Sequence, residues 1–149
     1  MKLSKSLEIL IADDDAEDRM LIMDALKESR LTNGVQSVEN GEELIQYLQN
    51  KGKFTDKKKY PLPGIILLDL NMPKKDGREA LKEIRADKTL KNIPIVILTT
   101  SKAEEDILKT YDLGANSFIT KPVTFSSMVE VMKTLNKYWF EIVELPSDI

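Results

Sequence analysis

The sequence predicts an α/β protein built on a doubly wound, five-stranded parallel sheet. Strand-like and amphipathic helical patterns alternate five times along its 149 residues, as expected when parallel strands are joined by crossover helices. The third and fourth strands are continuous apolar runs, which is typical of strands covered by helices on both faces. Because such crossovers are right-handed, few topologies remain, and the strand order 2-1-3-4-5 is a common one for these chains.

Apolar periodicity places two strand–helix units in the first third of the chain. Strands are expected over 8–12 and 35–38, a helix is expected over 16–30, and Asn40-Gly41 marks the turn into a second helix. The side chains expected to face the core from these two helices are Met20, Met23, Leu26, Leu44, Ile45 and Leu48. Segment 51–63 is polar, carries five lysines and ends with two prolines, so we expect a loop that is either simply solvated or a basic docking patch.

The rest of the chain repeats the strand–helix unit three times. The strands are expected over 64–69, 93–99 and 116–120, and the helices over 78–87, 103–112 and from Phe125 to Val143. The core-facing side chains of the third and fourth helices are expected to be Ala80, Leu81, Ile84, Ile107, Leu108 and Tyr111. We therefore expect a single domain over 1–149, with a core of about 7–137 and a C-terminal helical extension of about 138–149.

Composition excludes several classes of function. Hydrophobic residues make up 42% of the chain and charged residues 32%, which fits a soluble globular protein. The chain has no Cys and no His, so disulfides, thiolate chemistry, histidine triads and most zinc sites are excluded, and any phosphohistidine must belong to a partner. The net charge of −3 argues against a nucleic-acid partner. No apolar stretch approaches the roughly 20 residues that cross a bilayer and no signal peptide is found, so we expect a cytoplasmic protein without a membrane partner.

Polar residues follow four of the expected strands. Asp13-Asp14-Asp15 follows the first strand, Asp69 the third, Thr99 the fourth and Lys121-Pro122 the fifth. Each alone has an ordinary structural explanation, since the acidic triplet suits a helix cap and Asp69 suits a turn. The carboxyl ends of parallel strands meet at one edge of the sheet, however, so we expect these side chains to converge in one pocket.

The expected pocket combines residue types suited to phosphoryl transfer. Clustered carboxylates repel one another unless a cation lies among them, and Mg²⁺ prefers carboxylate and phosphate oxygens. A carboxylate is also a nucleophile that can form an aspartyl phosphate. The ammonium of Lys121 and the hydroxyl of Thr99 would neutralise and position the phosphoryl oxygens.

These residues, together with Asn71-Met72-Pro73 and Asp76-Gly77, resemble the receiver domain of two-component response regulators, which has a flavodoxin-like fold. The resemblance implies that Asp69 is the phosphoacceptor. It implies that Asp14 binds Mg²⁺ directly with Asp69 and the backbone carbonyl of Asn71, while Asp13 assists. Thr99 and Lys121 would bind the phosphoryl group, and Asp15 is left as a cap for the helix expected over 16–30.

The resemblance also implies a switch. Phe118 stands where receivers carry a switch aromatic, and inward movement of Thr99 would let its ring turn inward and remodel the face of the fourth helix, fifth strand and fifth helix. Phe lacks the hydroxyl of Tyr, so switching would depend on packing alone, and the alternative is a plain core aromatic. The Lys121–Pro122 bond is expected to be cis, as is usual there in the family. With Asn71, the bulky Thr100 is expected to tune dephosphorylation and to make it slow.

The basic loop, the triplet Thr99-Thr100-Ser101 and the C-terminal tail are similar to small stand-alone regulators paired with phytochrome histidine kinases, a group that tends to dimerise. Apolar residues near the C-terminus cover more than the single stripe, about 100° wide, that a helix packed on a sheet needs. They are Met128, Val131, Met132, Leu135, Tyr138, Trp139, Ile142 and Val143. The excess predicts a homodimer through the fourth helix, fifth strand, fifth helix and tail; the alternative is a tail folded onto its own domain.

The predicted function is that of a stand-alone response regulator, a signalling module rather than a classified enzyme. It would accept a phosphoryl group from a histidine kinase onto Asp69 and later lose it by hydrolysis. The alternative is a Mg²⁺-dependent phosphatase with an Asp nucleophile, but Asn71 occupies the position where such enzymes carry a second Asp as general acid. A flavin-binding protein is disfavoured because carboxylates would repel the flavin phosphate, and a degenerate scaffold because the polar set is complete.

Overall fold

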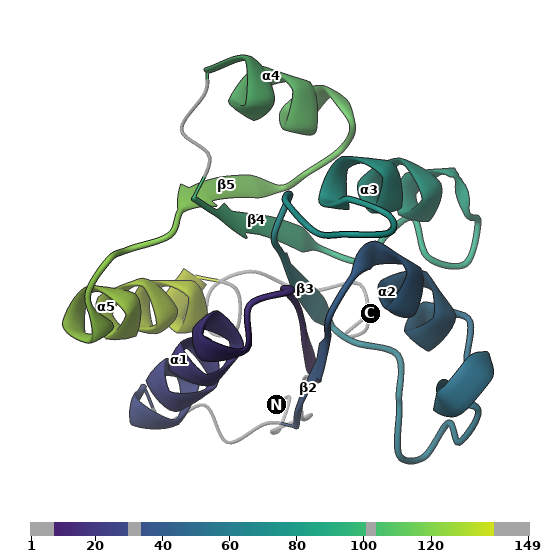
Figure 1. Cartoon of the computed structure of the whole chain (residues 1–149), viewed down its shortest axis with the longest axis horizontal. Coiled ribbons are helices and arrows are strands. Elements are labelled where there is room, and N and C mark those ends of the chain that lie inside the picture. Colours follow the sequence, from purple (N-terminus) through teal and green to yellow (C-terminus); the bar gives the residue numbers. More distant parts are fainter. Residues whose placement is uncertain (1–7, 30–33, 101–103, 139–149) are drawn as a thin grey trace.

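The computed structural model describes residues 8–29, 34–100 and 104–138, and it contains the five-stranded sheet that the sequence predicts (Figure 1). The strands are β1 Ile9–Ala12, β2 Val35–Val38, β3 Ile65–Leu68, β4 Ile95–Thr99 and β5 Ser117–Thr120. Their order is β2-β1-β3-β4-β5 and every neighbouring pair is parallel. The predicted fold class and strand order are confirmed.

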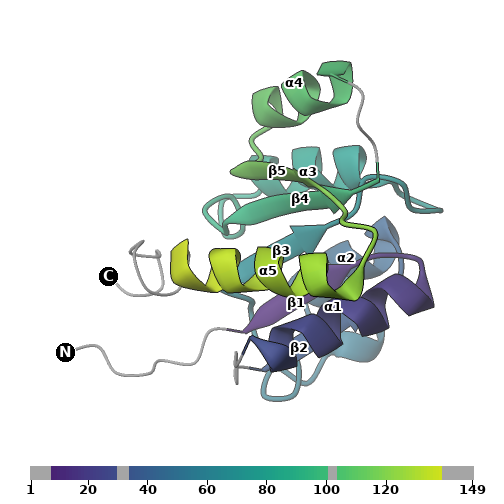
Figure 2. The same cartoon turned by 90° about the vertical axis from the view of Figure 1, so that its left-hand side faces the viewer.

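Helices cover both faces of this sheet. They are α1 Ala16–Glu28, α2 Gly41–Leu48, α3 Gly77–Ala86, α4 Glu104–Asp112 and α5 Phe125–Leu135, with a short 3-10 helix, η1, at Gly52–Phe54. The helices α1 and α5 lie side by side on one face, α2 and α3 cover the other face, and α4 lies beside the edge strand β5 (Figures 1 and 2). Within the described residues, no helix is both long enough and apolar enough to cross a membrane.

Successive strand residues enter two separate cores, because side chains alternate between the faces of a sheet. Leu10 and Ile66 pack with α2 and α3, whereas Ile9 and Ile65 pack with α1 and α5. All four of these side chains are at most 1% exposed. Burial on both faces explains why the strands are continuous apolar runs rather than alternating patterns.

In two helices, some residues that were expected to face the core are exposed, although Leu26 of α1 is buried as expected. In α1 the buried stripe is Ile22, Ala25 and Leu26, and Met20 is 65% exposed. Met20 precedes Ile22 by two residues, about 200° around the helix, so it points away from the sheet. In α4 the expected core residues Leu108 and Tyr111 are 62% and 46% exposed, while Thr110 is fully buried. The expected extension of the last helix to Val143 lies partly outside the described residues.

The lysine-rich segment 51–63 is anchored to the domain by aromatic side chains. Phe54 is buried, and its ring lies 5.3 Å from that of Tyr47 and 5.1 Å from that of Tyr60. The Tyr47 hydroxyl donates a hydrogen bond of 3.0 Å to the Pro61 carbonyl. The five lysines of the segment are exposed. The segment is therefore a solvated loop on its outer side and part of the core on its inner side.

Candidate functional site

Three carboxylates meet where β1 and β3 end. The backbone N–H of Asp69 donates to the Ala12 carbonyl at 2.9 Å, and that of Asp13 donates to the Val38 carbonyl at 3.1 Å. These bonds continue the parallel pairing by one residue and place Asp13 and Asp69 side by side. Carboxylate oxygens of Asp13, Asp14 and Asp69 lie within 4.8 Å of one another. Asp13 and Asp69 are 1% and 5% exposed, whereas Asp14 faces solvent.

The ammonium of Lys121 enters this cluster from the far edge of the sheet. Its backbone N–H donates to the Thr99 carbonyl at 2.7 Å, which fixes the end of β5 against the end of β4. Its Nζ lies 2.7 Å from Asp13, 2.8 Å from Asp18 and 3.4 Å from Asp69. The convergence of Lys121 with the acidic residues follows the prediction. Asp18, in the first turn of α1, was not predicted.

One ammonium is shared among several carboxylates, and burial and ion pairing shift the pKa values of Asp13 and Lys121. Burial raises the pKa of the Asp13 carboxyl above its ordinary 3.8, and hydrogen bonds from Lys121 and Asp15 only partly oppose the effect. Burial lowers the pKa of Lys121, but its hydrogen bonds to Asp13 and Asp18 and the negative charges of Asp13 and Asp69 reverse the effect and hold the pKa above its ordinary 10.5. The ammonium is therefore well compensated, while the acidic group as a whole retains an excess of negative charge.

Thr99, the last residue of β4, is fully buried. Among the described residues its hydroxyl oxygen has no hydrogen-bond partner. A buried hydroxyl without a partner costs roughly 1–3 kcal/mol, so such groups are rare in folded proteins. The hydroxyl is suited to an oxygen-rich group bound at this edge, as predicted for a phosphoryl oxygen.

The loop that carries Asp69 is held by close backbone contacts. Gly77 begins α3 and donates its N–H to the Leu70 carbonyl at 2.9 Å. A Cβ at Gly77 would overlap the Asp69 carbonyl, so only glycine allows this approach. Asp76 caps α3 by accepting hydrogen bonds from the N–H groups of Arg78 at 2.9 Å and Glu79 at 3.1 Å. Sequence alone signals the Asp-Gly turn but not this contact with the Asp69 backbone.

The donor set fits a divalent metal ion. Three clustered carboxylates are hard oxygen ligands of the kind that such ions prefer, and their residual negative charge needs a cation. Asp14 and Asn71 are exposed at the same edge and leave the cluster open to solvent. Asp15 does not join the cluster: its carboxylate accepts hydrogen bonds from the N–H groups of Glu17 and Asp18, so it caps α1 as expected.

The remaining predicted residues lie near this edge without entering the cluster. Phe118 is partly buried and packs against the core on the α2 and α3 face. Its backbone N–H donates to the Tyr111 hydroxyl of α4 at 3.1 Å, so a tyrosine from the neighbouring helix binds the backbone at this position. Thr100 is exposed just beyond β4.

The expected cis bond before Pro122 is wrong for this structure, since the described residues contain no cis peptide bond. Trans is the lower-energy isomer of an X–Pro bond by about 0.5–1 kcal/mol. With the trans bond, Lys121 already reaches both Asp13 and Asp69. Nothing in the contacts of Lys121 therefore requires the higher-energy isomer.

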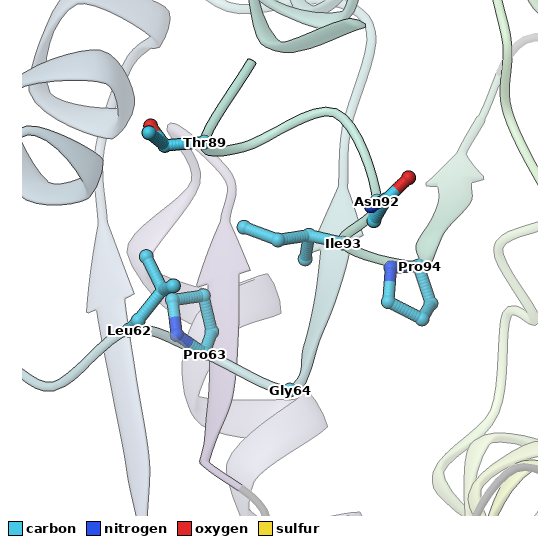
Figure 3. Close-up of a pocket in the computed structure, with 7 residues that line it drawn as sticks. All are labelled: Leu62, Pro63, Gly64, Thr89, Asn92, Ile93 and Pro94. Carbon is cyan, nitrogen blue, oxygen red and sulfur yellow. The ribbon is translucent and has the colours of Figure 1, made fainter. Parts of the chain in front are cut away.

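A hollow lies at the opposite edge of the sheet, where β3 and β4 begin (Figure 3). Leu62, Pro63, Ile93 and Pro94 supply apolar walls, and Thr89 and Asn92 supply uncharged polar groups. None of the residues that line it is ionisable. This hollow therefore lacks the carboxylates and the ammonium group that the chemistry expected at the acidic edge requires.

Residues 9–133 match the family described as the response regulator receiver domain. The chain belongs to this family. Response regulator Rcp1 of Synechocystis is 37% identical over 139 residues, which cover 93% of this chain and 92% of Rcp1. Chemotaxis protein CheY-3 of Vibrio cholerae is 31% identical over 128 residues, which cover 86% and 90% of the two chains.

Solved structures of receivers agree with the fold. The crystal structure of the phosphorylated cyanobacterial phytochrome response regulator RcpA superposes with a TM-score of 0.87 at 40% identity, covering 95% of this chain and 99% of RcpA. The Mn²⁺-bound form of Rcp1 superposes with a TM-score of 0.84 at 36% identity, covering 94% and 99%. The chain is thus a receiver of the two-component type, and its relatives include phytochrome-associated response regulators.

Proposed function

We propose that this receiver acts as a response regulator that accepts a phosphoryl group from a histidine kinase onto Asp69 with Mg²⁺. One observation carries the proposal: the buried Asp69 carboxylate lies 3.4 Å from the Lys121 ammonium and within 4.8 Å of two further carboxylates. The unpartnered Thr99 hydroxyl at the neighbouring strand end supports it. Because the chain has no His, the phosphohistidine must come from the partner.

In the proposed transfer, a carboxylate oxygen of Asp69 attacks the phosphorus of the kinase phosphohistidine. A P–O bond forms, the P–N bond breaks, and the leaving imidazole takes a proton from solvent. Lys121 and Thr99 would each bind a phosphoryl oxygen. Mg²⁺ held by Asp13, Asp14, Asp69 and the Asn71 carbonyl would neutralise charge on the transferring group.

The relatives support the metal and the type of kinase. Rcp1 has been solved with Mn²⁺ bound, and RcpA is a phosphorylated phytochrome response regulator. We accordingly propose a phytochrome-type histidine kinase as the partner. The single-domain organisation over 1–149 and the cytoplasmic location stay predictions.

Output is proposed to occur through α4, β5 and α5. Four large apolar side chains on α4, just before α5 and at its first residue are exposed: Leu108, Tyr111, Val123 and Phe125. A hollow between β5 and α5, lined by Ile119, Val131 and Leu135 together with the polar Glu130 and Thr134, adds apolar surface at the same group of elements. Such a surface supports a homodimer. Light scattering after size-exclusion chromatography should give a dimer at micromolar concentration, and a strict monomer with and without a phosphoryl analogue would reject it.

Loss of the phosphoryl group by hydrolysis is proposed to be slow, because the exposed Thr100 lies next to Thr99 and would hinder an attacking water. Replacing Thr100 with Ala should shorten the phosphoryl lifetime. An unchanged lifetime would remove Thr100 from this role.

The central test uses acetyl phosphate as phosphodonor and intact mass as readout. Wild type with Mg²⁺ should gain one phosphoryl group, and Asp69→Asn should gain none. Asp24→Asn is the matched control, because Asp24 is an exposed Asp on α1 outside the cluster, and it should behave as wild type. Steady release of phosphate from many small esters, without a stable adduct, would instead favour the Asp-nucleophile phosphatase.

A further inference from the structure

The Lys121 ammonium has three carboxylate partners, and one of them, Asp18, belongs to a helix rather than to a strand end. The Nζ atom is 2.8 Å from Asp18, compared with 3.4 Å from Asp69. The Lys121 side chain is only 6% exposed, so little water competes for its N–H groups. Before any phosphorylation, the ammonium is therefore held more closely by Asp18 than by the proposed phosphoacceptor.

The start of α1 fixes Asp18 in this position. Asp15 caps the helix and accepts hydrogen bonds from the N–H groups of Glu17 at 2.9 Å and Asp18 at 3.2 Å. A carboxylate in the first turn of a helix also interacts favourably with the helix dipole. The Asp18 side chain is 32% exposed, whereas that of Asp13 is 2% exposed. If Lys121 leaves, water can therefore hydrate the Asp18 carboxylate, whereas the Asp13 carboxylate would stay buried without a partner.

We propose that Asp18 restrains phosphoryl transfer: it holds the Lys121 ammonium in the unphosphorylated protein and releases it when phosphoryl oxygens arrive at Asp69. The role presupposes phosphorylation of Asp69 as proposed above. An ammonium has three N–H donors, and three carboxylates surround this one. Phosphoryl oxygens that arrive at Asp69 compete with the Asp13 and Asp18 carboxylates for the N–H groups of Lys121. Asp13 is buried, whereas Asp18 is partly exposed, so Asp18 is the more readily exchanged of these two partners.

Asp18 then slows phosphorylation in two ways. Its carboxylate competes with the phosphoryl oxygens for the ammonium. Its negative charge also lies beside an incoming phosphodonor that is negatively charged itself. Removing the charge of Asp18 should therefore speed phosphorylation about two- to fivefold, the scale expected for a partly exposed ion pair.

The test compares Asp18→Asn with two matched variants, Glu17→Gln and Asp18→Glu. Glu17 is exposed, neighbours Asp18 in the same helical turn and makes no ion pair with Lys121, so Glu17→Gln removes the same charge without the contact. The readout is the initial rate of phosphoryl uptake from acetyl phosphate at saturating Mg²⁺, followed by intact mass. Asp18→Asn should be about two- to fivefold faster than wild type, and the other two variants should match wild type. A rate for Asp18→Asn at or below wild type, or an equal gain in Glu17→Gln, would overturn the proposal.

A second readout separates this role from phosphorylation itself. In protein labelled with ¹⁵N-lysine and free of Mg²⁺, NMR reports hydrogen exchange of the Lys121 ammonium. Exchange should be at least roughly twofold faster in Asp18→Asn than in wild type and Glu17→Gln. Equal exchange in the three proteins would overturn the role of Asp18 even if wild type takes up no phosphoryl group, an outcome that would separately defeat the proposed function.

Discussion

At the amino-terminal edge of the sheet, the donors of a cation are satisfied by neutral acceptors, whereas at the carboxyl-terminal edge a different cation is surrounded by an excess of carboxylates. Arg85 of α3 donates to the carbonyls of Gly114, Lys91 and Ile93 at 2.7–2.8 Å and to the Asn116 side chain at 2.9 Å. All four acceptors are neutral oxygens. Lys121 at the other edge meets three carboxylates, and the Thr99 hydroxyl nearby has no partner among the described residues.

The difference separates a structural edge from a chemical one. At the amino-terminal edge, polar groups satisfy one another, and the Asn116 side chain also accepts from the Ile95 N–H at 2.8 Å. At the carboxyl-terminal edge, the negative charge is not fully balanced and a buried hydroxyl has no partner among the described residues. Both features lower stability, and both leave groups that can bind a ligand. Substitutions should therefore lower stability at the first edge and should change ligand binding, with little or no loss of stability, at the second.

The largest effect on stability is expected from Arg85→Ala. It removes four hydrogen bonds and leaves partly buried carbonyls without donors, so the free energy of unfolding should fall by about 2–3 kcal/mol. The melting temperature should fall by roughly 5–10 °C. Lys82→Ala, at an exposed position of the same helix, should change it little. Equal melting temperatures for the two variants would contradict a structural role for Arg85 at the amino-terminal edge.

Asp13→Asn should raise the free energy of unfolding rather than lower it. Because burial raises the Asp13 pKa in the folded protein, its contribution to stability is fully present below pH 3.8 and is lost as pH rises through the folded-state pKa. In metal-free buffer at pH 7, the Asn variant should therefore be more stable than wild type by about 1 kcal/mol. The gain should shrink as pH falls toward 3.8. Thermal melts in EDTA at both pH values measure this, and a less stable variant at pH 7 would contradict it.

Mg²⁺ should stabilise wild type by mass action. At a concentration several-fold above its dissociation constant, the expected gain in the free energy of unfolding is about 1 kcal/mol. Asp14 is exposed, so Asp14→Asn should abolish this gain while leaving metal-free stability nearly unchanged. Melting curves with and without Mg²⁺ test both statements, and an undiminished Mg²⁺ effect in the variant would remove Asp14 from the metal site.

The smallest effect on the free energy of unfolding is expected from a comparison of two fully buried threonines. Thr110 has its hydroxyl 2.9 Å from the Asp106 carbonyl and 3.0 Å from the Ile107 carbonyl, whereas Thr99 has no such partner among the described residues. Thr99→Val should therefore raise the free energy of unfolding by up to about 1 kcal/mol and lower phosphoryl uptake, while Thr110→Val should not raise it. A destabilised Thr99→Val protein would show that its hydroxyl is already satisfied.

The chemical edge could be predicted in outline because strand direction determines where residues distant in the sequence meet. Asp13, Asp69 and Lys121 each follow an apolar run, and parallel pairing brings such positions together. Asp18 could not be found in this way, since it lies one turn inside α1 and meets Lys121 only through the reach of the long lysine side chain. The trans bond before Pro122 was missed because the expectation came from the family rather than from local contacts.

Helix faces and loops were harder to predict for a different reason. The apolar residues of α1 cover a broad arc, so spacing alone did not distinguish the buried Ile22 from the exposed Met20. In segment 51–63 the lysines and prolines predict a loop. They give no sign that Phe54 and Tyr60 pack against Tyr47 and anchor that loop to the domain. Such contacts depend on packing between elements, which residue periodicity does not encode.

The proposed role of the acidic edge is tested most directly by locating the phosphoryl group. After incubation with acetyl phosphate and Mg²⁺, borohydride reduces an aspartyl phosphate to homoserine, and peptide mass spectrometry then identifies the position. Homoserine should appear at Asp69 and should require Mg²⁺. Reduction at another carboxylate, or no reduction at any position, would contradict the assignment of Asp69 as the phosphoacceptor.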